Sequence, residues 1–232
     1  MSKLFCRMTF FLLSVCLIFP MTGALAKSRH LVVVDPAHGG LDKGVRLSKK
    51  VSEKDVTLII ARLLKKDLES SKNIKVLLTR SADGDVSDTD RAGIARKAGT
   101  DLFVSLHINA GFGRKSSGFE VYFPGFDSAI DKNRSNEILK DMVTTKYLNE
   151  SVKIAQIIQK NMGKIFPRKD RGLRSAPVLV LEGLTVPAVV LEIGFATNTE
   201  DKKKLLDQTT QKSIARALAK SIEEFFKYTG AK

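Results

Sequence analysis

Two histidines and two glutamates lie at positions in the sequence where side chains commonly carry out chemistry. His38 lies in a glycine-containing loop after a short apolar run, and His107 and Glu192 each directly follow another apolar run. Glu53 lies in the first turn of a predicted helix. Two histidine nitrogens and one carboxylate, with a fourth position open to water, are typical of a catalytic zinc site. A further carboxylate can act as a general base on that water.

Each of these four residues also has a structural interpretation. His38 could cap a turn, and His107 could be a buried histidine whose nitrogens are satisfied within the core. Glu53 could stabilise the N-terminus of its helix through its charge, and the pattern alone favours that role. Glu192 interrupts an apolar stretch, where a carboxylate is rarely left without a partner, so a functional role is favoured there.

The hydrophobic pattern predicts strands that alternate with helices. Short apolar runs predict strands at residues 31–34, 74–78, 102–106, 118–123, 178–181 and 188–191. Apolar residues at helical spacing predict helices from residue 53 onward and at residues 91–98, 151–162 and 210–226. This alternation is typical of an α/β fold with a mostly parallel central sheet flanked by helices, in one domain over residues 27–232. Ligands bind at the carboxyl ends of strands in such sheets, so His38, His107 and Glu192 are expected at one rim.

The first 26 residues predict a secretory signal peptide. Lys3 and Arg7 precede an apolar run at residues 8–19, and Ala24 and Ala26 are the small residues that a signal peptidase recognises. The run is shorter than the roughly 20 residues that a membrane-spanning helix needs, so we expect cleavage after Ala26. We therefore expect an exported protein, in the periplasm or outside the cell, with no stable membrane anchor after cleavage.

Composition narrows the classes of function. The chain has 232 residues, a formal charge of +14, two cysteines and three histidines. Both cysteines precede the predicted cleavage point, so a cysteine nucleophile and a thiolate metal site are excluded in the exported part. The sequence has no complete phosphate loop, no His-Glu-x-x-His and no Gly-x-Ser-x-Gly motif. The charge suits an anionic polymer, whereas export and the lack of a recognised binding motif argue against nucleic acid.

Three ordered motifs, each at the end of a predicted strand, resemble the zinc-dependent N-acetylmuramoyl-L-alanine amidases of bacterial cell walls. The motifs are VVVDPAHGG at residues 32–40, SLHINA at residues 105–110 and LEIGFATN at residues 191–198. Together with shorter matches between them, the likeness spans nearly the whole predicted domain. Ala37 stands where glycine is common in the family, which raises the question whether that loop position needs a positive φ.

The resemblance implies a zinc ion held by His38, Glu53 and His107, with Glu192 as the catalytic carboxylate. It implies hydrolysis of the amide bond between N-acetylmuramic acid and L-alanine in peptidoglycan, contributing to cell-wall remodelling or lysis. A catalytically silent peptidoglycan-binding module, or a zinc peptidase acting on stem peptides, are the alternative functions. The presence of all four site residues argues against the silent module. We expect a monomer.

Further predictions concern the residues around the site and one inserted segment. Asn109, Arg171 and Asn198 are expected to contact substrate, and Asp35 and Asn109 are candidates for orienting the two histidines. Residues 124–150 form a longer connection than a compact domain needs. A solvated loop and helix is the simpler interpretation of this segment. The alternative is a lid over the metal site on which a protein activator acts.

Overall fold

The computed structural model describes residues 29–125 and 137–230, without the side chains of residues 137–144. The predicted signal peptide lies outside the described residues and stays a prediction. None of the helices in the described part is long and apolar enough to cross a membrane. In chain order the elements are β1 (His30–Pro36), α1 (Glu53–Glu69), β2 (Ile74–Leu78), α2 (Asp88–Lys97), β3 (Leu102–Asn109), β4 (Phe119–Pro124), α3 (Glu137–Met162), β5 (Asp170–Ala176), the 3-10 helix η1 (Leu179–Leu181), β6 (Ala188–Phe195), α4 (Thr199–Leu206) and α5 (Gln208–Gly230).

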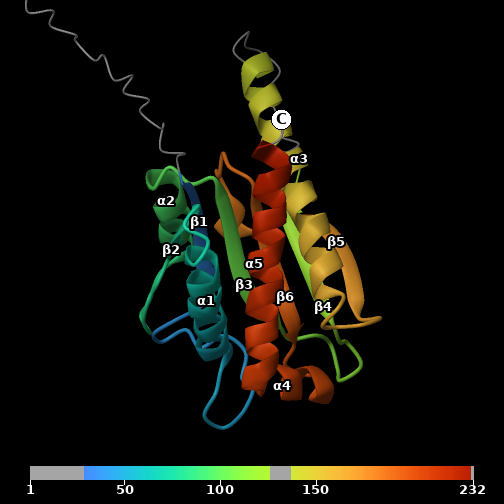
Figure 1. Cartoon of the computed structure of the whole chain (residues 1–232). Coiled ribbons are helices and arrows are strands. Elements are labelled where there is room, and N and C mark those ends of the chain that lie inside the picture. The colour runs from blue at the N-terminus through green and yellow to red at the C-terminus, as the bar shows by residue number, and fades with distance from the viewer. Residues whose placement is uncertain (1–28, 126–136, 231–232) are drawn as a thin grey trace, which may run out of the picture.

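Six strands form one sheet in the order β2-β1-β3-β6-β4-β5 (Figure 1). All neighbouring strands pair in parallel except β4 and β6, which are antiparallel. The predicted α/β fold with a mostly parallel sheet is therefore confirmed. The central strands are buried on both faces, which is why β1, β3 and β6 read as continuous apolar runs rather than as alternating ones.

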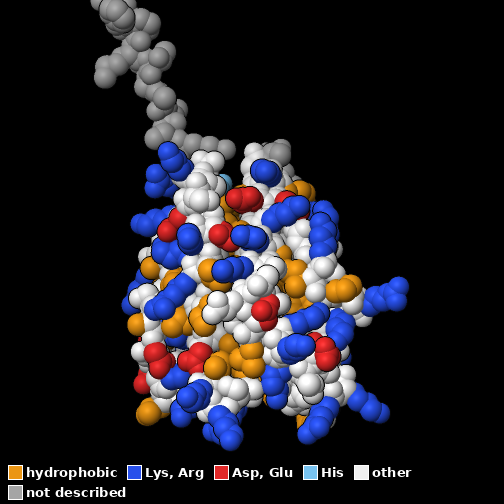
Figure 2. All heavy atoms as spheres, turned by 60° about the horizontal axis from the view of Figure 1, so that its bottom comes forward, with side chains coloured by type: hydrophobic (Ala, Val, Ile, Leu, Met, Phe, Trp, Pro, Cys, Tyr) orange, Lys and Arg blue, Asp and Glu red, His pale blue; other side chains and the backbone are white. Residues whose placement is uncertain are grey.

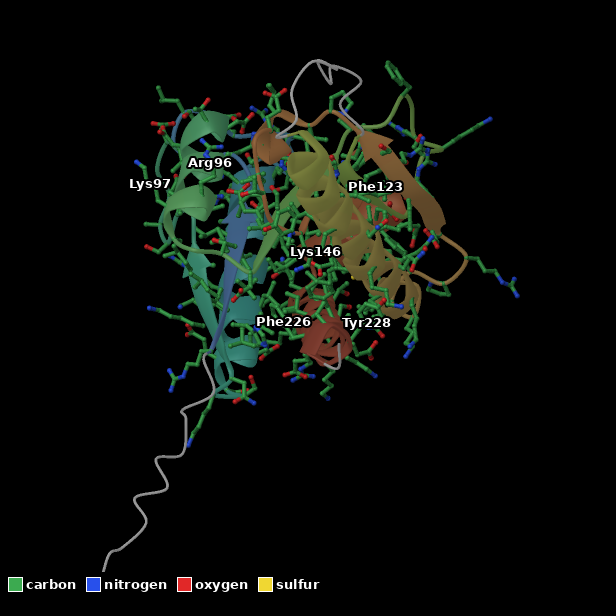
Figure 3. The ribbon with its side chains drawn as sticks, turned by 90° about the horizontal axis from the view of Figure 1, so that it is seen from above. Arg96, Lys97, Phe123, Lys146, Phe226 and Tyr228 are labelled. Atoms are coloured by element: carbon green, nitrogen blue, oxygen red, sulfur yellow. The ribbon has the colours of Figure 1, made fainter. Side chains whose placement is uncertain are left out.

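Helices cover both faces of the sheet. The larger core packs α1, α3 and α5 against one face, and the smaller core packs α2 and η1 against the other. Figure 3 looks along the sheet from one end and shows Arg96 and Lys97 of α2 on the side opposite Phe226 and Tyr228 of α5. At the other end of the molecule, which Figure 2 brings forward, Lys and Arg side chains are spread over the surface. The parallel strands β1, β3 and β6 end at this end of the sheet (Figure 1).

Two sequence predictions about elements are wrong. The apolar run at residues 178–181 is not a strand but contains η1, because Val180 and Leu181 pack as a short turn against the smaller core. The strand that the sequence did not predict is β5. It is a polar segment at the edge of the sheet, where few side chains need to be buried. The segment 124–150 includes the end of β4 and the first half of α3, and its residues 126–136 lie outside the described part of the chain.

Candidate metal centre

The structure brings His38, Glu53, His107 and Glu192 together at the carboxyl ends of β1, β3 and β6. His38 lies in the loop after β1, Glu53 is the first residue of α1, and His107 of β3 pairs in register with Glu192 of β6. Residues that are paired across neighbouring strands share a face of the sheet. The chain neighbours of His107 and Glu192 pack in the larger core, so both side chains project from the face that α2 and η1 cover.

His38 is held in an unusual backbone conformation. Its φ is 60°, a left-handed value that costs a non-glycine residue about 1 kcal/mol. The positive φ therefore falls on His38 itself and not on Ala37, where the sequence had raised the question. His38 Nδ1 lies 2.6 Å from Asp42 Oδ2, which leaves Nε2 to face Glu53. Asp42 was not predicted from the sequence, because an aspartate in a glycine-rich loop usually indicates only a turn.

Glu53 is fixed by the backbone around it. Its side chain is 2% exposed, and its two oxygens accept hydrogen bonds from the N–H of Ile108 at 2.8 Å and of Val45 at 3.0 Å. Gly44, at a φ of +59°, lets the loop approach this carboxylate. A Cβ there would lie 2.5 Å from Glu53 Oε2 and 2.6 Å from His38 Cδ2. The position of Glu53 thus depends on the absence of a side chain at residue 44.

Three side chains present ligand atoms to one point. One atom each of His38, Glu53 and His107 lies within 4.8 Å of the others. Glu53 Oε1 is 3.1 Å from His38 Nε2 and 3.5 Å from His107 Nδ1. A histidine that ligates a metal commonly donates a hydrogen bond from its other ring nitrogen to a carboxylate, and His38 is paired with Asp42 in this way. Two nitrogens and one oxygen held in this way fit a divalent metal ion such as zinc.

The residues of the metal-free cluster have shifted pKa values. Hydrogen bonding to Glu53 raises the pKa of His38 to about 9, against the opposing effect of burial, and Asp42 adds to the rise. Burial would raise the pKa of Glu53, but hydrogen bonds with His107 and His38 outweigh it and lower that pKa to about 2. Burial lowers the pKa of His107, yet Glu53 and the charge of Glu192 raise it overall. A cation at this point would displace the proton that the raised pKa favours on His38 in the metal-free chain.

Glu192 lies beside the cluster with a carboxylate oxygen that no described residue satisfies. Its Oε2 is buried and has no hydrogen-bond partner among the described residues. Burial raises the pKa of Glu192 to about 7; the charge of His107 opposes this rise, and the charges of Glu53 and Glu120 add to it. A carboxylate with a pKa near neutrality can both take up and release a proton at working pH.

Asp35 does not contact the histidines as expected. It is fully buried, and its oxygens accept hydrogen bonds from Thr79 at 2.5 Å, Ser105 at 2.7 Å and Arg91 at 2.5 Å. Arg91 in turn donates to the carbonyl oxygen of His38 at 2.8 Å. Asp35 therefore supports the metal site through Arg91 and the backbone, and not by a contact with an imidazole ring.

The three residues expected to contact substrate have different surroundings. Asn198 is the N-cap of α4: its Oδ1 accepts from the backbone of residues 200 and 201, and its Nδ2 donates to the carbonyl of Arg114. These bonds give Asn198 a structural role, and its contact with substrate stays a prediction. Asn109 ends β3 and is half-buried, two residues beyond His107. Arg171 lies on β5 beside Glu120 of β4, to which its Nε donates.

Most of the described chain matches one known protein family. A family model described as N-acetylmuramoyl-L-alanine amidase matches residues 32–224. The chain belongs to this amidase family. The match begins within β1, ends within α5 and includes all four residues of the candidate site.

Two relatives in the family are about 30% identical to the chain over the aligned residues. The amidase AmiC of Escherichia coli O6:H1 is 30% identical over 231 residues, which cover 89% of this chain and 55% of AmiC. The amidase AmiA of Escherichia coli K12 is 31% identical over 222 residues, which cover 85% of this chain and 76% of AmiA. The chain thus spans about half the length of AmiC.

Solved structures of the family have the same fold. An N-acetylmuramoyl-L-alanine amidase from Clostridium difficile 630 superposes with a TM-score of 0.72 at 27% identity, covering 86% of this chain and 98% of that one. The catalytic domain of the amidase CwlV from Bacillus (Paenibacillus) polymyxa var. colistinus gives 0.70 at 28% identity, covering 88% of this chain and 99% of that domain. The described fold therefore corresponds to nearly the whole of both structures.

Proposed function

We propose that this chain is a zinc-dependent N-acetylmuramoyl-L-alanine amidase that hydrolyses the amide bond between N-acetylmuramic acid and L-alanine in peptidoglycan. The observation that carries the proposal is the convergence of His38, Glu53 and His107 on one point. Beside them lies Glu192, whose buried Oε2 has no hydrogen-bond partner among the described residues. Membership of the amidase family supports the choice of bond.

The residues of the cluster divide into those that hold the metal and one that handles protons. Nε2 of His38, Oε1 of Glu53 and Nδ1 of His107 would hold the zinc ion. A zinc ion bound there supplies a Lewis acid, which polarises a carbonyl group and lowers the pKa of water. Glu192 accepts a proton from the attacking water and delivers it to the amide nitrogen as the bond breaks. Burial raises the pKa of Glu192 to about 7 in the metal-free chain, and this tendency to hold a proton suits a carboxylate that must take one up from water.

The proposal includes export and a peptidoglycan partner. The strongly basic chain, with Lys and Arg side chains over the end that carries the site, suits an anionic wall polymer (Figure 2). Export rests on the predicted signal peptide at residues 1–26, with residues 27–232 as the catalytic domain. A lid over the site within residues 124–150, and an activator acting on it, stay predictions. Deleting part of that segment would raise turnover if it covers the site.

Mass spectrometry of peptidoglycan digested with the purified, zinc-loaded chain tests the proposed function. Free stem peptides that begin with L-alanine are expected, and a chelator should abolish their release. Glu192→Gln should keep zinc binding and lose turnover, because the glutamine side chain cannot take up the proton of the attacking water. Products cut within the stem peptide would indicate a peptidase instead. Binding of peptidoglycan without any cleavage would indicate a silent module.

A further inference from the structure

A second group of charged side chains lies next to Glu192 and is not used by the chemistry above. Glu120 of β4 pairs directly across the antiparallel ladder with Glu192 of β6. Its side chain is 4% exposed and accepts hydrogen bonds from Tyr122 and Arg171, while Arg174 Nη2 lies 3.5 Å from its Oε1. We call Glu120, Tyr122, Arg171 and Arg174 the Glu120 cluster.

A β-bulge places both arginines of this cluster on one face of the sheet. Residues three apart in a regular strand point to opposite faces. Between the pairs Phe119–Asp170 and Val121–Leu173, β4 contributes only Glu120, whereas β5 contributes Arg171 and Gly172. The extra residue is Gly172, whose φ of +92° is a conformation that glycine tolerates and other residues rarely adopt. Bulges of this kind commonly redirect a side chain next to a functional site.

The two guanidinium groups keep unused hydrogen-bond donors. Arg171 gives Nε to Glu120 and lies over the ring of Phe195, with its Cζ 5.0 Å from the ring centroid. These two contacts fix the plane of its guanidinium group. Within the described part of the chain no hydrogen bond uses its two terminal nitrogens. The side chains of Arg171 and Arg174 are 36% and 48% exposed, so solvent or a ligand can reach both.

The cluster carries a surplus of positive charge close to the reaction centre. Glu120 supplies one negative charge against the two positive charges of Arg171 and Arg174. His107, Glu192, Glu120 and Arg171 lie in a row across the neighbouring strands β3, β6, β4 and β5. Neighbouring strands are about 4.8 Å apart, so the backbone of Arg171 is about 10 Å from that of Glu192. Two residues of an extended peptide span about 7 Å of that distance, and the arginine side chain reaches across the rest.

We propose that Arg171 and Arg174 form a carboxylate-binding subsite, with Glu120 as its buried anchor, and that it recognises the free α-carboxylate of the acidic residue after L-alanine in the stem peptide. This inference rests on the proposed amidase function and adds a determinant of substrate choice to it. The planar donors of a guanidinium group match the two oxygens of a carboxylate. Glu120 positions the arginines and does not itself contact the substrate.

The test compares two synthetic muropeptides that differ in one group. One carries D-glutamate with a free α-carboxylate after L-alanine, and the other carries the corresponding α-carboxamide. The wild-type zinc-loaded chain should prefer the carboxylate, measured as the ratio of the two kcat/KM values. Arg174→Gln should lower this ratio about tenfold, chiefly through a higher KM for the carboxylate substrate, because a hydrogen bond to a charged group is lost. Arg171→Lys should lower it as well, since lysine keeps the charge but loses the planar pair of donors.

The control is Arg216→Gln, which removes the same charge from an exposed position on α5, the helix on the opposite face of the sheet. It should leave the ratio unchanged. Equal cleavage of both muropeptides by the wild type, or an unchanged ratio in Arg174→Gln, would overturn the subsite while leaving the amidase function intact. A wild-type chain that cleaves neither muropeptide and releases no stem peptides from peptidoglycan would overturn the proposed function, and the subsite with it.

Discussion

Replacing Arg91 with methionine should strongly destabilise the metal-free chain. Arg91 is 2% exposed and donates hydrogen bonds to Asp35 at 2.5 Å and to the carbonyl oxygens of Pro36 at 2.9 Å, His38 at 2.8 Å and Val86 at 3.0 Å. Methionine matches the arginine side chain only as far as Nε and has no donor, so it leaves a buried carboxylate without its counter-charge and three carbonyl groups without this donor. Breaking a buried ion pair in this way costs about 3–5 kcal/mol.

Urea unfolding of the zinc-free protein, followed by circular dichroism, measures the loss. A domain of this kind has a total stability of about 5–15 kcal/mol, so the variant should unfold at a much lower urea concentration or fail to fold. Arg91→Lys keeps the charge near Asp35 but has fewer donors, and it should lie between the wild type and Arg91→Met. The matched control is Arg216→Met at an exposed position of α5.

If Arg91→Met lowers the free energy of unfolding by less than about 1 kcal/mol, as Arg216→Met should, this account of Arg91 is refuted. A second consequence follows from the bond to His38. Because Arg91 holds the carbonyl of a residue with positive φ, Arg91→Lys should also weaken zinc binding, measured by competition with a chromogenic chelator. Unchanged zinc affinity would mean that the loop keeps its shape without this bond.

Four further predictions concern the metal centre and its surroundings. Because the pKa of His38 is raised to about 9 without metal, zinc binding near pH 7 should release about one proton or more, seen by titration calorimetry in buffers of different ionisation enthalpy. The same raised pKa means that protonated His38 stabilises the metal-free fold. This contribution is complete below the unfolded pKa of about 6.5 and is lost as the pH rises through the folded pKa of about 9. The urea concentration at the midpoint of unfolding should therefore fall between pH 6.5 and pH 9. Asp42→Asn should weaken zinc affinity about 10- to 100-fold, and an unchanged affinity would exclude Asp42 as the partner that orients His38. Asn198→Ala should cost about 1 kcal/mol of stability through loss of the α4 cap, with KM unaffected; a raised KM would restore the substrate contact expected from the sequence.

The fold class could be predicted from the sequence because buried parallel strands have continuous apolar sequences. The prediction failed for β5, because an edge strand has a polar sequence, and for the run at 178–181, which a small core accommodates as a turn. The antiparallel pairing of β4 with β6 also escaped prediction. Strand order and direction depend on which distant segments pair, and periodicity within one segment does not record this.

The sequence by itself determined which residues could do chemistry: His38, His107 and Glu192 follow apolar runs, and the end of a strand is a local property of the chain. Only the tertiary structure decided how these residues are held. Glu53 binds the backbone of residue 108 across 55 positions in sequence, and Asp35 reaches Arg91 across 56. The row that joins Glu192 to Arg171 exists only through strand register and one bulge. Burial, register and hydrogen bonding between distant segments arise only when the chain is folded, so spacing along the sequence cannot specify them.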